Sequence, residues 1–233
     1  MTQTVVLTGA NRGLGLELAR VFAGRGDTVI AGCRNPAAAT DLAVVTSHVH
    51  AVDMGDAASI AAFVATIGDR PIDVVINNAG IDARNLGAAA DERDVLVQPV
   101  DHLMGEITVN TVGPLLLVRG LLPNLQSTSN PRVVNVSSQV GSMEVGAKVG
   151  RDLGYSVSKA ALNMVTVKLG MRLRDEGVTA IALHPGYLRT DMGGAAAAME
   201  PSEAAASIAA LVDGLTIADT GTFKRWDGTT HPW

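Results

Sequence analysis

A chain of 233 residues is long enough for one well-filled domain, and a second independent domain is not expected. Hydrophobic residues make up 47 % and charged residues 18 %, which excludes a disordered chain and favours a sheet covered on both faces. The net charge of -5 and the lack of any run of Lys and Arg argue against a nucleic-acid surface.

The single cysteine, Cys33, rules out an intrachain disulfide and is compatible with a reducing compartment. The five histidines lack the spacing of metal ligands, so no metal site is expected. A first strand within a few residues of Met1 leaves no room for a signal peptide, and no apolar run reaches the roughly 18–20 residues of a membrane span. We therefore expect a soluble, cytoplasmic protein.

Short runs rich in valine and isoleucine alternate with helix-like stretches along the chain. We predict strands at residues 4–8, 28–32, 48–53, 72–77, 132–137, 179–184 and 221–223, and helices at residues 13–24, 56–67, 99–121, 154–175 and 201–213. Pro114 lies inside the long third helix, where a proline can produce a kink. Alternating strands and helices imply right-handed crossovers and a parallel sheet. The sequence thus predicts one domain with a Rossmann-type, doubly wound parallel sheet in three α/β/α layers.

A glycine-rich turn joins the first predicted strand to the first predicted helix. Gly9, Gly13 and Gly15 lack side chains, so the backbone can approach a pyrophosphate at the helix N-terminus, where unpaired N–H groups and a partial positive charge lie. The spacing is GxxxGxG and not GxGxxG, and such a turn can also serve merely as a connection. As a dinucleotide site, the turn would contribute residues Thr8, Gly9, Asn11, Arg12, Gly13, Leu14 and Gly15.

The end of the second predicted strand indicates which dinucleotide would bind. An NAD-specific site would place Asp or Glu there, whereas this chain has Cys33 and Arg34. An arginine can pair with a 2′-phosphate, and Arg12 in the glycine turn would add a second positive charge. The alternative is that both are ordinary surface arginines. We expect NADP(H) to be preferred over NAD(H).

Two further strand ends are expected at the cofactor. Asp53 ends the third predicted strand, where its carboxylate and the backbone of Met54 would meet the adenine edge. Asn77, Asn78, Ala79 and Gly80 end the fourth, and the small residues Ala79 and Gly80 with Asn78 allow close approach to the second ribose.

Tyr155 and Lys159 lie at i and i+4 of a predicted helix and therefore share a face. A lysine near a phenol favours the phenolate, so we expect it to lower a tyrosine pKa that is about 10 when unperturbed. Such a pair can donate and accept a proton near neutral pH. Taken alone, the pair can also be a packed tyrosine and a solvated lysine.

These motifs occur together in one order. The segment TGANRGLG, the strand end at Asp53, NNAG, Asn110, Ser137-Ser138, YSVSK and His184-Pro185-Gly186 resemble the short-chain dehydrogenase/reductase family over nearly the whole chain. Residues 184–194 and the tail at 221–228 resemble the subgroup of bacterial C-factor signalling proteins and sniffer-type carbonyl reductases.

The resemblance implies roles for individual residues. Asn110, Ser138, Tyr155 and Lys159 would be catalytic, with Tyr155 as general acid or base and Lys159 on the nicotinamide ribose. Ser138 would polarise the substrate carbonyl. Asn110 would anchor a water on the proton path, although a buried asparagine needs a partner in any case. Four residues would flank the nicotinamide: Pro185, Gly186, Leu188 and Thr190.

Either of two adjacent serines, Ser137 or Ser138, could be the one that polarises the substrate carbonyl. Successive strand residues point to opposite faces, so only one can face the site, and the family pattern favours Ser138 over Ser137. The substrate pocket is expected among residues 82–98, an insert at 144–153 and residues 193–201 after the Pro-Gly motif. The insert and the last segment can equally be surface loops.

The implied function is NADPH-dependent reduction of a ketone, aldehyde or quinone. The alternative is a nucleotide-binding signalling protein with little turnover. The family resemblance also implies a homodimer or tetramer through the long helix and the YxxxK helix. The apolar stretches at 115–122 and 160–169 would suit such an interface, and would equally suit packing on the sheet.

Overall fold

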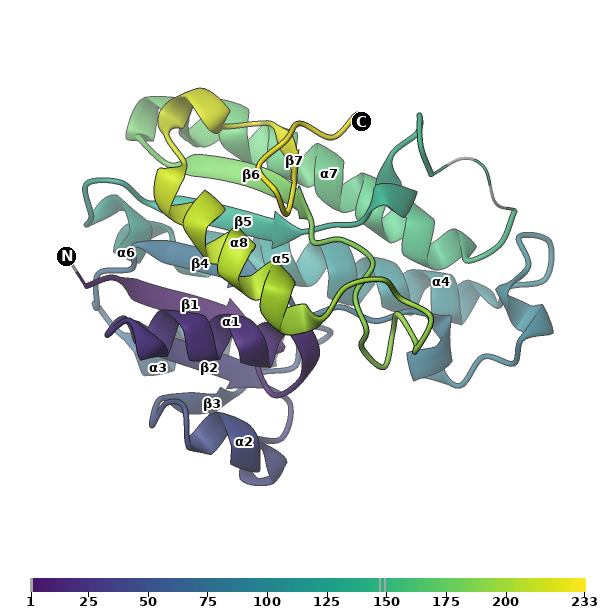
Figure 1. The fold of residues 1–233 in the computed structure, drawn as a ribbon, viewed down its shortest axis with the longest axis horizontal. Coiled ribbons are helices and arrows are strands. Elements are labelled where there is room, and N and C mark those ends of the chain that lie inside the picture. Colours follow the sequence, from purple (N-terminus) through teal and green to yellow (C-terminus); the bar gives the residue numbers. More distant parts are fainter. Residues whose placement is uncertain (1, 147, 149) are drawn as a thin grey trace.

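The computed structural model describes residues 2–146, 148 and 150–233. In this part of the chain, seven parallel strands form one sheet in the order β3-β2-β1-β4-β5-β6-β7 (Figure 1). The strands are β1 (Thr4–Thr8), β2 (Thr28–Cys33), β3 (Val49–Ala51), β4 (Val74–Asn77), β5 (Arg132–Val136), β6 (Thr179–His184) and β7 (Phe223–Arg225). The strand order reverses between β1 and β4, which confirms the predicted doubly wound sheet.

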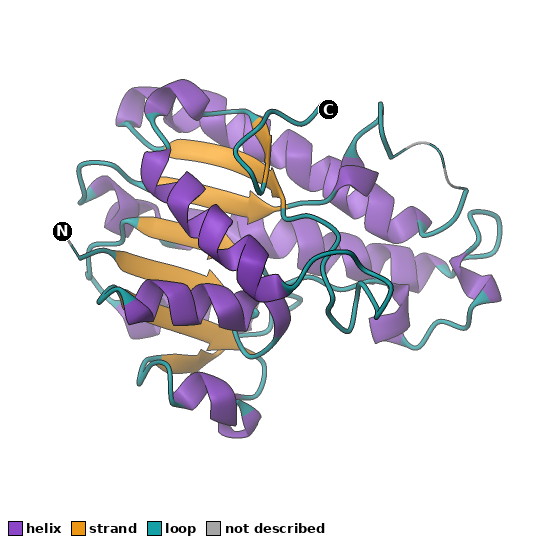
Figure 2. Cartoon of the chain, viewed as in Figure 1, coloured by secondary structure: helices purple, strands orange, loops and turns teal. Residues whose placement is uncertain are grey.

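Helices cover both faces of the sheet and form three layers (Figure 2). The α-helices are α1 (Gly13–Gly24), α2 (Thr40–Ala43), α3 (Ala57–Ile67), α4 (Val100–Ile107), α5 (Gly113–Gly120), α6 (Leu122–Gln126), α7 (Leu153–Leu173) and α8 (Pro201–Gly214). One core packs β-strand side chains against α1, α2 and α8, and a second packs them against α3, α5, α6 and α7. Within the described residues, no helix is both long and apolar enough to cross a bilayer.

The predicted long helix contains an irregular turn. Helices α4 and α5 are joined by a π-helical turn, Thr108–Val112, in which the N–H of Gly113 bonds to the carbonyl of Thr108. Pro114 follows directly and has no N–H, so it cannot donate to the carbonyl of Asn110 as an α-helix requires. The proline therefore produces a change of helical pitch at Asn110.

Five predicted strands differ in extent from those observed: β2 and β5 by one residue at one end, and β3, β4 and β7 by more. Residues 48–53 were expected to be extended, but β3 ends at Ala51, and the Asp53 carboxylate accepts a hydrogen bond from Gly55 N at 2.8 Å in a turn. The prediction for residues 221–223 is wrong because Gly221 adopts a φ of 77°. Gly221 N and the Thr222 carbonyl already bond to β6, but the residues in register with β6 begin at Phe223, so β7 is displaced toward the C-terminus.

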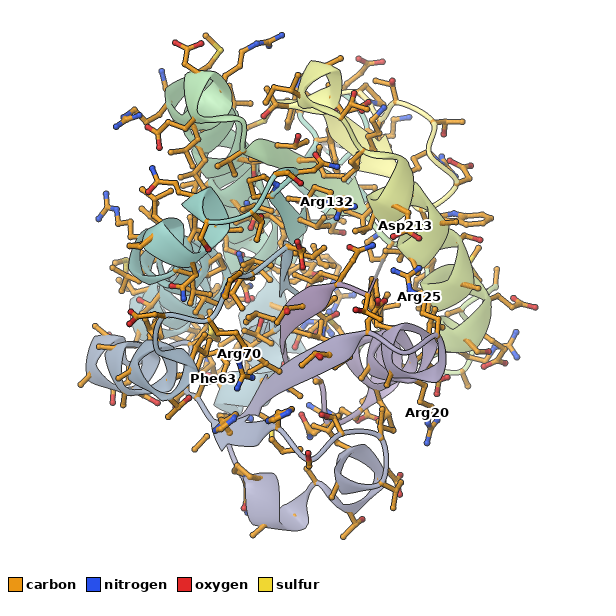
Figure 3. All side chains as sticks on the ribbon, turned by 90° about the vertical axis from the view of Figure 1, so that its left-hand side faces the viewer. Arg20, Arg25, Phe63, Arg70, Arg132 and Asp213 are labelled. Carbon is orange, nitrogen blue, oxygen red and sulfur yellow. The ribbon has the colours of Figure 1, made fainter. Side chains whose placement is uncertain are left out.

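Charged side chains connect the N-terminal ends of the strands to α1 and α8 by hydrogen bonds and ion pairs (Figure 3). The buried guanidinium of Arg132 donates to the carbonyl of Val212 at 3.0 Å and to Gln3 Oε1 at 2.7 Å. Arg25, directly after α1, pairs with Asp213 of α8 at 2.6 Å. These contacts satisfy a buried cation, and they lie at the end of the sheet opposite the glycine turn.

Candidate active site

The carboxyl ends of the strands meet at one edge because all strands are parallel. This edge carries Thr8 of β1, Asn77 of β4, and Ser137 and Ser138 directly after β5. The reversal between β1 and β4 lies here, at the position where open α/β sheets bind ligands. Most residues that the sequence indicated therefore come together at one end of the molecule.

The glycine turn is packed against the segment that follows β4. A Cβ at Gly9 would lie 2.8 Å from Ala79 Cα, and one at Gly15 would lie 2.2 Å from the carbonyl oxygen of Gly9. Asn78 Nδ2 donates to the carbonyl oxygens of Thr8 and Gly9 at 3.0 and 3.1 Å. At Gly9 and Gly15, the surrounding protein therefore leaves no room for a side chain.

The N-terminus of α1 suits an anion. Its N-cap residue, Arg12, makes no side-chain capping bond, and the first turn contains no acidic residue. Gly13 has a φ of 53° and lies beside Thr190 from the segment after β6. Asn11 is exposed and Leu14 is buried in the core, so Leu14 can offer a ligand only its backbone. Free N–H groups and the helix dipole here match a phosphate.

The residues expected to select the cofactor differ in their surroundings. Arg34, directly after β2, is exposed and forms no ion pair among residues 2–146, 148 and 150–233. Arg12 instead pairs with Asp191 at the surface. Asp191 neutralises much of the second positive charge that the sequence suggested. Asp53 is exposed in its turn, and Met54 is buried.

Tyr155, Ser138 and Lys159 converge in front of β5. The Ser138 side chain lies near enough to the phenol of Tyr155 to lower its pKa, whereas Ser137 donates to Asn163 Oδ1 at 2.6 Å. The adjacent serines thus point in different directions, and Ser138 is the one beside the tyrosine. Lys159 is buried, and its ammonium donates to the carbonyl of Val136 at 2.8 Å and lies 5.6 Å from the centroid of the Tyr155 ring.

The expected effect of Lys159 on Tyr155 is not observed in this structure. Burial raises the pKa of Tyr155 to about 12, and the negative charges of Asp82 and Glu106 act in the same direction. The hydrogen bond from Ser138 lowers that pKa but is the smaller effect. Burial also lowers the pKa of Lys159 to about 8, because the ammonium is taken out of water. Desolvation is therefore the largest influence on the pKa of both groups.

Asn110 is fully buried in the π-helical turn. Its side-chain oxygen accepts from Ile81 N at 2.8 Å, and its amide donates to Ile81 O at 2.8 Å and to Ser158 Oγ at 3.0 Å. The side chain is thus occupied in joining the β4 loop to α7. Gly80 lies between Asn110 and Lys159, since a Cβ there would be 3.3 Å from Asn110 Oδ1 and 3.4 Å from Lys159 Nζ.

The segment after β6 closes one side of the site. Pro185 and Gly186 follow β6 directly, and Gly186 has a φ of 95° and packs on Trp226. Leu188 is buried and Thr190 meets the glycine turn. Arg84, from the loop after β4, donates to the carbonyl of Met192 at 2.6 Å.

The insert and the cavity beside it lie on a different side of α7. A cavity of about 190 Å³ is lined by Ser142, Met143 and Gly146 from the insert region, by Ser156, Val157 and Ala160 of α7, and by Val95. Neither Ser138 nor Tyr155 lines it. Residues 147 and 149 of the predicted insert at 144–153 lie outside the described residues.

Sequence reasoning missed a buried acid near the tyrosine. Glu106 of α4 is 1 % exposed, and its Oε2 accepts from Gln98 Nε2 at 2.7 Å. Burial raises the pKa of Glu106 to about 7, with Asp82 and Asp152 acting in the same direction. A sequence signal existed, because Glu106 lies four residues before Asn110 and so shares its inward face.

Glu106→Gln should flatten the pH dependence of stability between about pH 4.5 and 7. The folded state binds the Glu106 proton more tightly than the unfolded state, so stability falls as pH rises through this window. At pH 8 the variant should be more stable than the wild type by on the order of 3 kcal/mol, the equivalent of the pKa difference. Urea unfolding at pH 5 and pH 8 measures this, and an equal stability gap at both pH values contradicts it.

Comparison with known proteins agrees with this geometry. Residues 3–201 match the family model described as short chain dehydrogenase. The C-signal protein of Myxococcus xanthus is 34 % identical over 172 residues, which cover 74 % of this chain and 99 % of that protein.

Two solved structures share the fold. The NADPH-bound carbonyl reductase from chicken fatty liver superposes with a TM-score of 0.88 at 31 % identity, covering 100 % of this chain and 99 % of that one. The carbonyl reductase Sniffer of Drosophila melanogaster gives 0.84 at 29 % identity over 100 % of both chains. The chain is therefore an oxidoreductase that belongs to the short-chain dehydrogenase family.

Proposed function

We propose that this protein is an NADPH-dependent reductase of a ketone, aldehyde or quinone. The observation that carries the proposal is the convergence of Ser138, Tyr155 and Lys159 beside a glycine turn whose helix N-terminus is uncapped. The similarity to two carbonyl reductases supports the same substrate class. Reduction of a carbonyl needs a proton donor and a polarising hydroxyl at the same oxygen, which Tyr155 and Ser138 supply.

Each residue has a distinct task in this mechanism. When bound, NADPH supplies the hydride. Ser138 donates a hydrogen bond to the carbonyl oxygen, and Tyr155 protonates that oxygen as it becomes an alcohol. After Tyr155 has given up its proton, the positive charge of Lys159 would stabilise the remaining phenolate until that group takes up another proton. Because Pro114 cannot donate to the Asn110 carbonyl, that carbonyl is the group of Asn110 that would hold a water on the proton path.

The residues that would hold the cofactor follow the strand ends. The first turn of α1, residues 13–15 with Thr8, Gly9, Asn11 and Arg12, would bind the diphosphate. Arg34 would bind the 2′-phosphate, and Asp53 and Met54 the adenine. The ribose and nicotinamide would lie against Asn78, Ala79, Gly80, Tyr155, Lys159, Pro185, Gly186, Leu188 and Thr190.

Arg34→Glu should raise the KM for NADPH far more than the KM for NADH. The exposed guanidinium would otherwise pair with the 2′-phosphate, and a carboxylate repels it. We expect about a hundredfold change in the ratio of the two kcat/KM values, the equivalent of one charge-assisted pair. Steady-state kinetics with both cofactors measures the ratio. Equal effects on both would show that Arg34 does not contact the phosphate, and Arg70→Glu serves as a charge-matched control.

The proposal is tested by following NADPH oxidation against a panel of aldehydes, ketones and quinones. Turnover of at least one carbonyl class by the wild-type protein is expected. No turnover of any compound, by protein that still binds NADPH, would contradict the proposed function.

The similarity to C-signal favours one other candidate, a nucleotide-binding signalling protein with little turnover. The presence of Tyr155, Lys159 and Ser138 in one cluster weighs against it, because a pure sensor needs no proton donor. A non-catalytic variant that still rescues a deletion phenotype would support this second candidate.

We also propose a homo-oligomer, a dimer or a tetramer, that forms through α4, α5 and α7. Part of the apolar stretch at 115–122 packs on the sheet, with Leu117, Val118 and Leu121 buried. Other apolar side chains remain exposed, including Met104, Met164 and Met171 of these helices and Val112 of the π-helical turn. Light scattering coupled to size exclusion gives the mass, and a monomer at micromolar concentration contradicts this.

A further inference from the structure

The first turn of α7, which carries Tyr155, is held by a hydrogen-bond chain from α4. Gln98 Oε1 accepts from the backbone N–H of Gly154 at 3.0 Å, and Gln98 Nε2 donates to Glu106 Oε2 at 2.7 Å. Gly154 is the residue directly before Tyr155. The N–H groups of a first helical turn have no partner within the helix, so Gln98 supplies one that the helix lacks.

The same two side chains fill the space beside the α-carbon of Gly154. A Cβ on Gly154 would lie 1.9 Å from Glu106 Oε2 and 2.6 Å from Gln98 Nε2. Helices α4 and α7 lie side by side along this contact (Figure 1). The glycine before the catalytic tyrosine is therefore required by the Gln98–Glu106 pair, and the pair in turn fixes how close α7 comes to α4.

Neighbouring contacts leave Glu106 with few other partners. Its Oε1 is buried without a hydrogen-bond partner among the described residues. The ionisable groups around it are Asp82 after β4, Asp152 before α7, Tyr155 on α7 and His102 one turn earlier on α4. Asp82 is paired with Arg84, and Asp152 with Arg93. Gln98 is thus the side-chain hydrogen-bond partner of this buried carboxyl, and the backbone of Ala83 also lowers its pKa.

We propose that Glu106 and Gln98 are positioning residues for Tyr155, and that Glu106 also sets the electrostatic field at its phenol. The chain Glu106–Gln98–Gly154 holds the first turn of α7 at the distance from β5 at which the phenol meets Ser138. The proposal rests on the proposed function, because it assigns these residues to the proton-transfer step. Displacement of a catalytic group by about 1 Å is sufficient to reduce turnover by on the order of 100-fold.

The test compares four variants. Glu106→Leu and Gln98→Ala break the chain and should lower kcat by about tenfold to a hundredfold, with the KM for NADPH little changed. Glu106→Gln preserves the acceptor for Gln98 and should keep most of the wild-type kcat. Gln126→Ala breaks an exposed Gln–Glu pair, to Glu176 at 2.5 Å, at the far end of the molecule and is the matched control.

The pH profile separates positioning from a merely structural role. Ionised Glu106 disfavours the phenolate of Tyr155, so its removal in Glu106→Gln should move the alkaline fall of reduction to lower pH. Wild-type kcat in Glu106→Leu and Gln98→Ala would overturn the proposal. Loss of kcat in Glu106→Gln as great as in Glu106→Leu, with an unmoved alkaline limb, would also overturn it.

Amide hydrogen exchange in residues 153–157 gives a readout that does not depend on turnover. Gln98→Ala should exchange faster there than the wild type, and Gln126→Ala should not. Unchanged amide exchange at residues 153–157 in Gln98→Ala would overturn the proposed hydrogen-bond chain even if the enzyme is active. A wild type without turnover but with the expected exchange would instead contradict the proposed function alone.

Discussion

Tyr155→Phe should lower kcat for carbonyl reduction by roughly 10²–10⁴-fold, the usual contribution of a positioned general acid. The change removes one hydroxyl and leaves the ring, which is half-buried in front of β5. Ser138 and Lys159 stay in place, so NADPH binding should be nearly unchanged. Single-turnover NADPH oxidation and NADPH titration by fluorescence measure the two quantities.

The chain contains one other tyrosine, which provides the control. Tyr187 is 54 % exposed and lies in the segment after β6. Tyr187→Phe removes the same hydroxyl and should change kcat far less. If Tyr155→Phe keeps more than a few per cent of wild-type activity, Tyr155 is not the proton donor.

Gly15→Ala should have the second largest effect of the proposed substitutions, by lowering both stability and the affinity for NADPH. The added methyl would lie 2.2 Å from the Gly9 carbonyl oxygen and 2.6 Å from Asn78 Nδ2, and both belong to the glycine turn or its support. The turn must move, which should cost roughly 1–3 kcal/mol of stability, as overpacking does. NADPH binding should weaken by about tenfold or more, the equivalent of at least 1.4 kcal/mol. Urea unfolding and NADPH titration measure both effects.

Gly24→Ala is the matched control on the same helix. Nothing lies within 4 Å of a Cβ at Gly24, at the other end of α1. Alanine there restricts the unfolded chain and should raise stability by about 0.4–1 kcal/mol. A Gly15→Ala protein that is as stable and binds NADPH as tightly as Gly24→Ala would show that the turn does not need the glycine.

The fold could be predicted because the sequence pattern of each segment reflects that segment's own preference for strand or helix. Runs of valine and isoleucine between amphipathic stretches specify a parallel sheet, and the predicted sheet and three layers are observed. The π-helical turn was not predicted, because Pro114 indicates a kink but not its geometry. The start of β7 depends on the φ of Gly221, which no pattern of side chains reveals.

The candidate site likewise has features that could be predicted from local spacing and features that depend on distant segments. The glycine turn and the Tyr155–Lys159 pair were found from spacing, and the structure brings them to one end of the sheet. The direction of the Tyr155 pKa was predicted wrongly, because burial and the charges of Asp82 and Glu106 come from other segments. The pairing of Arg12 with Asp191 also joins residues that are far apart in the sequence.

The central claim is that this protein transfers a hydride to a carbonyl carbon. The most direct measurement uses NADPH that is fully deuterated at C4 of the nicotinamide, an aldehyde or ketone from the panel, and mass spectrometry of the product. The account predicts an alcohol that carries one deuterium on its carbinol carbon with wild-type protein, formed at least about 100-fold more slowly with Tyr155→Phe. Unlabelled alcohol, or no alcohol from protein that has bound the labelled cofactor, would contradict it.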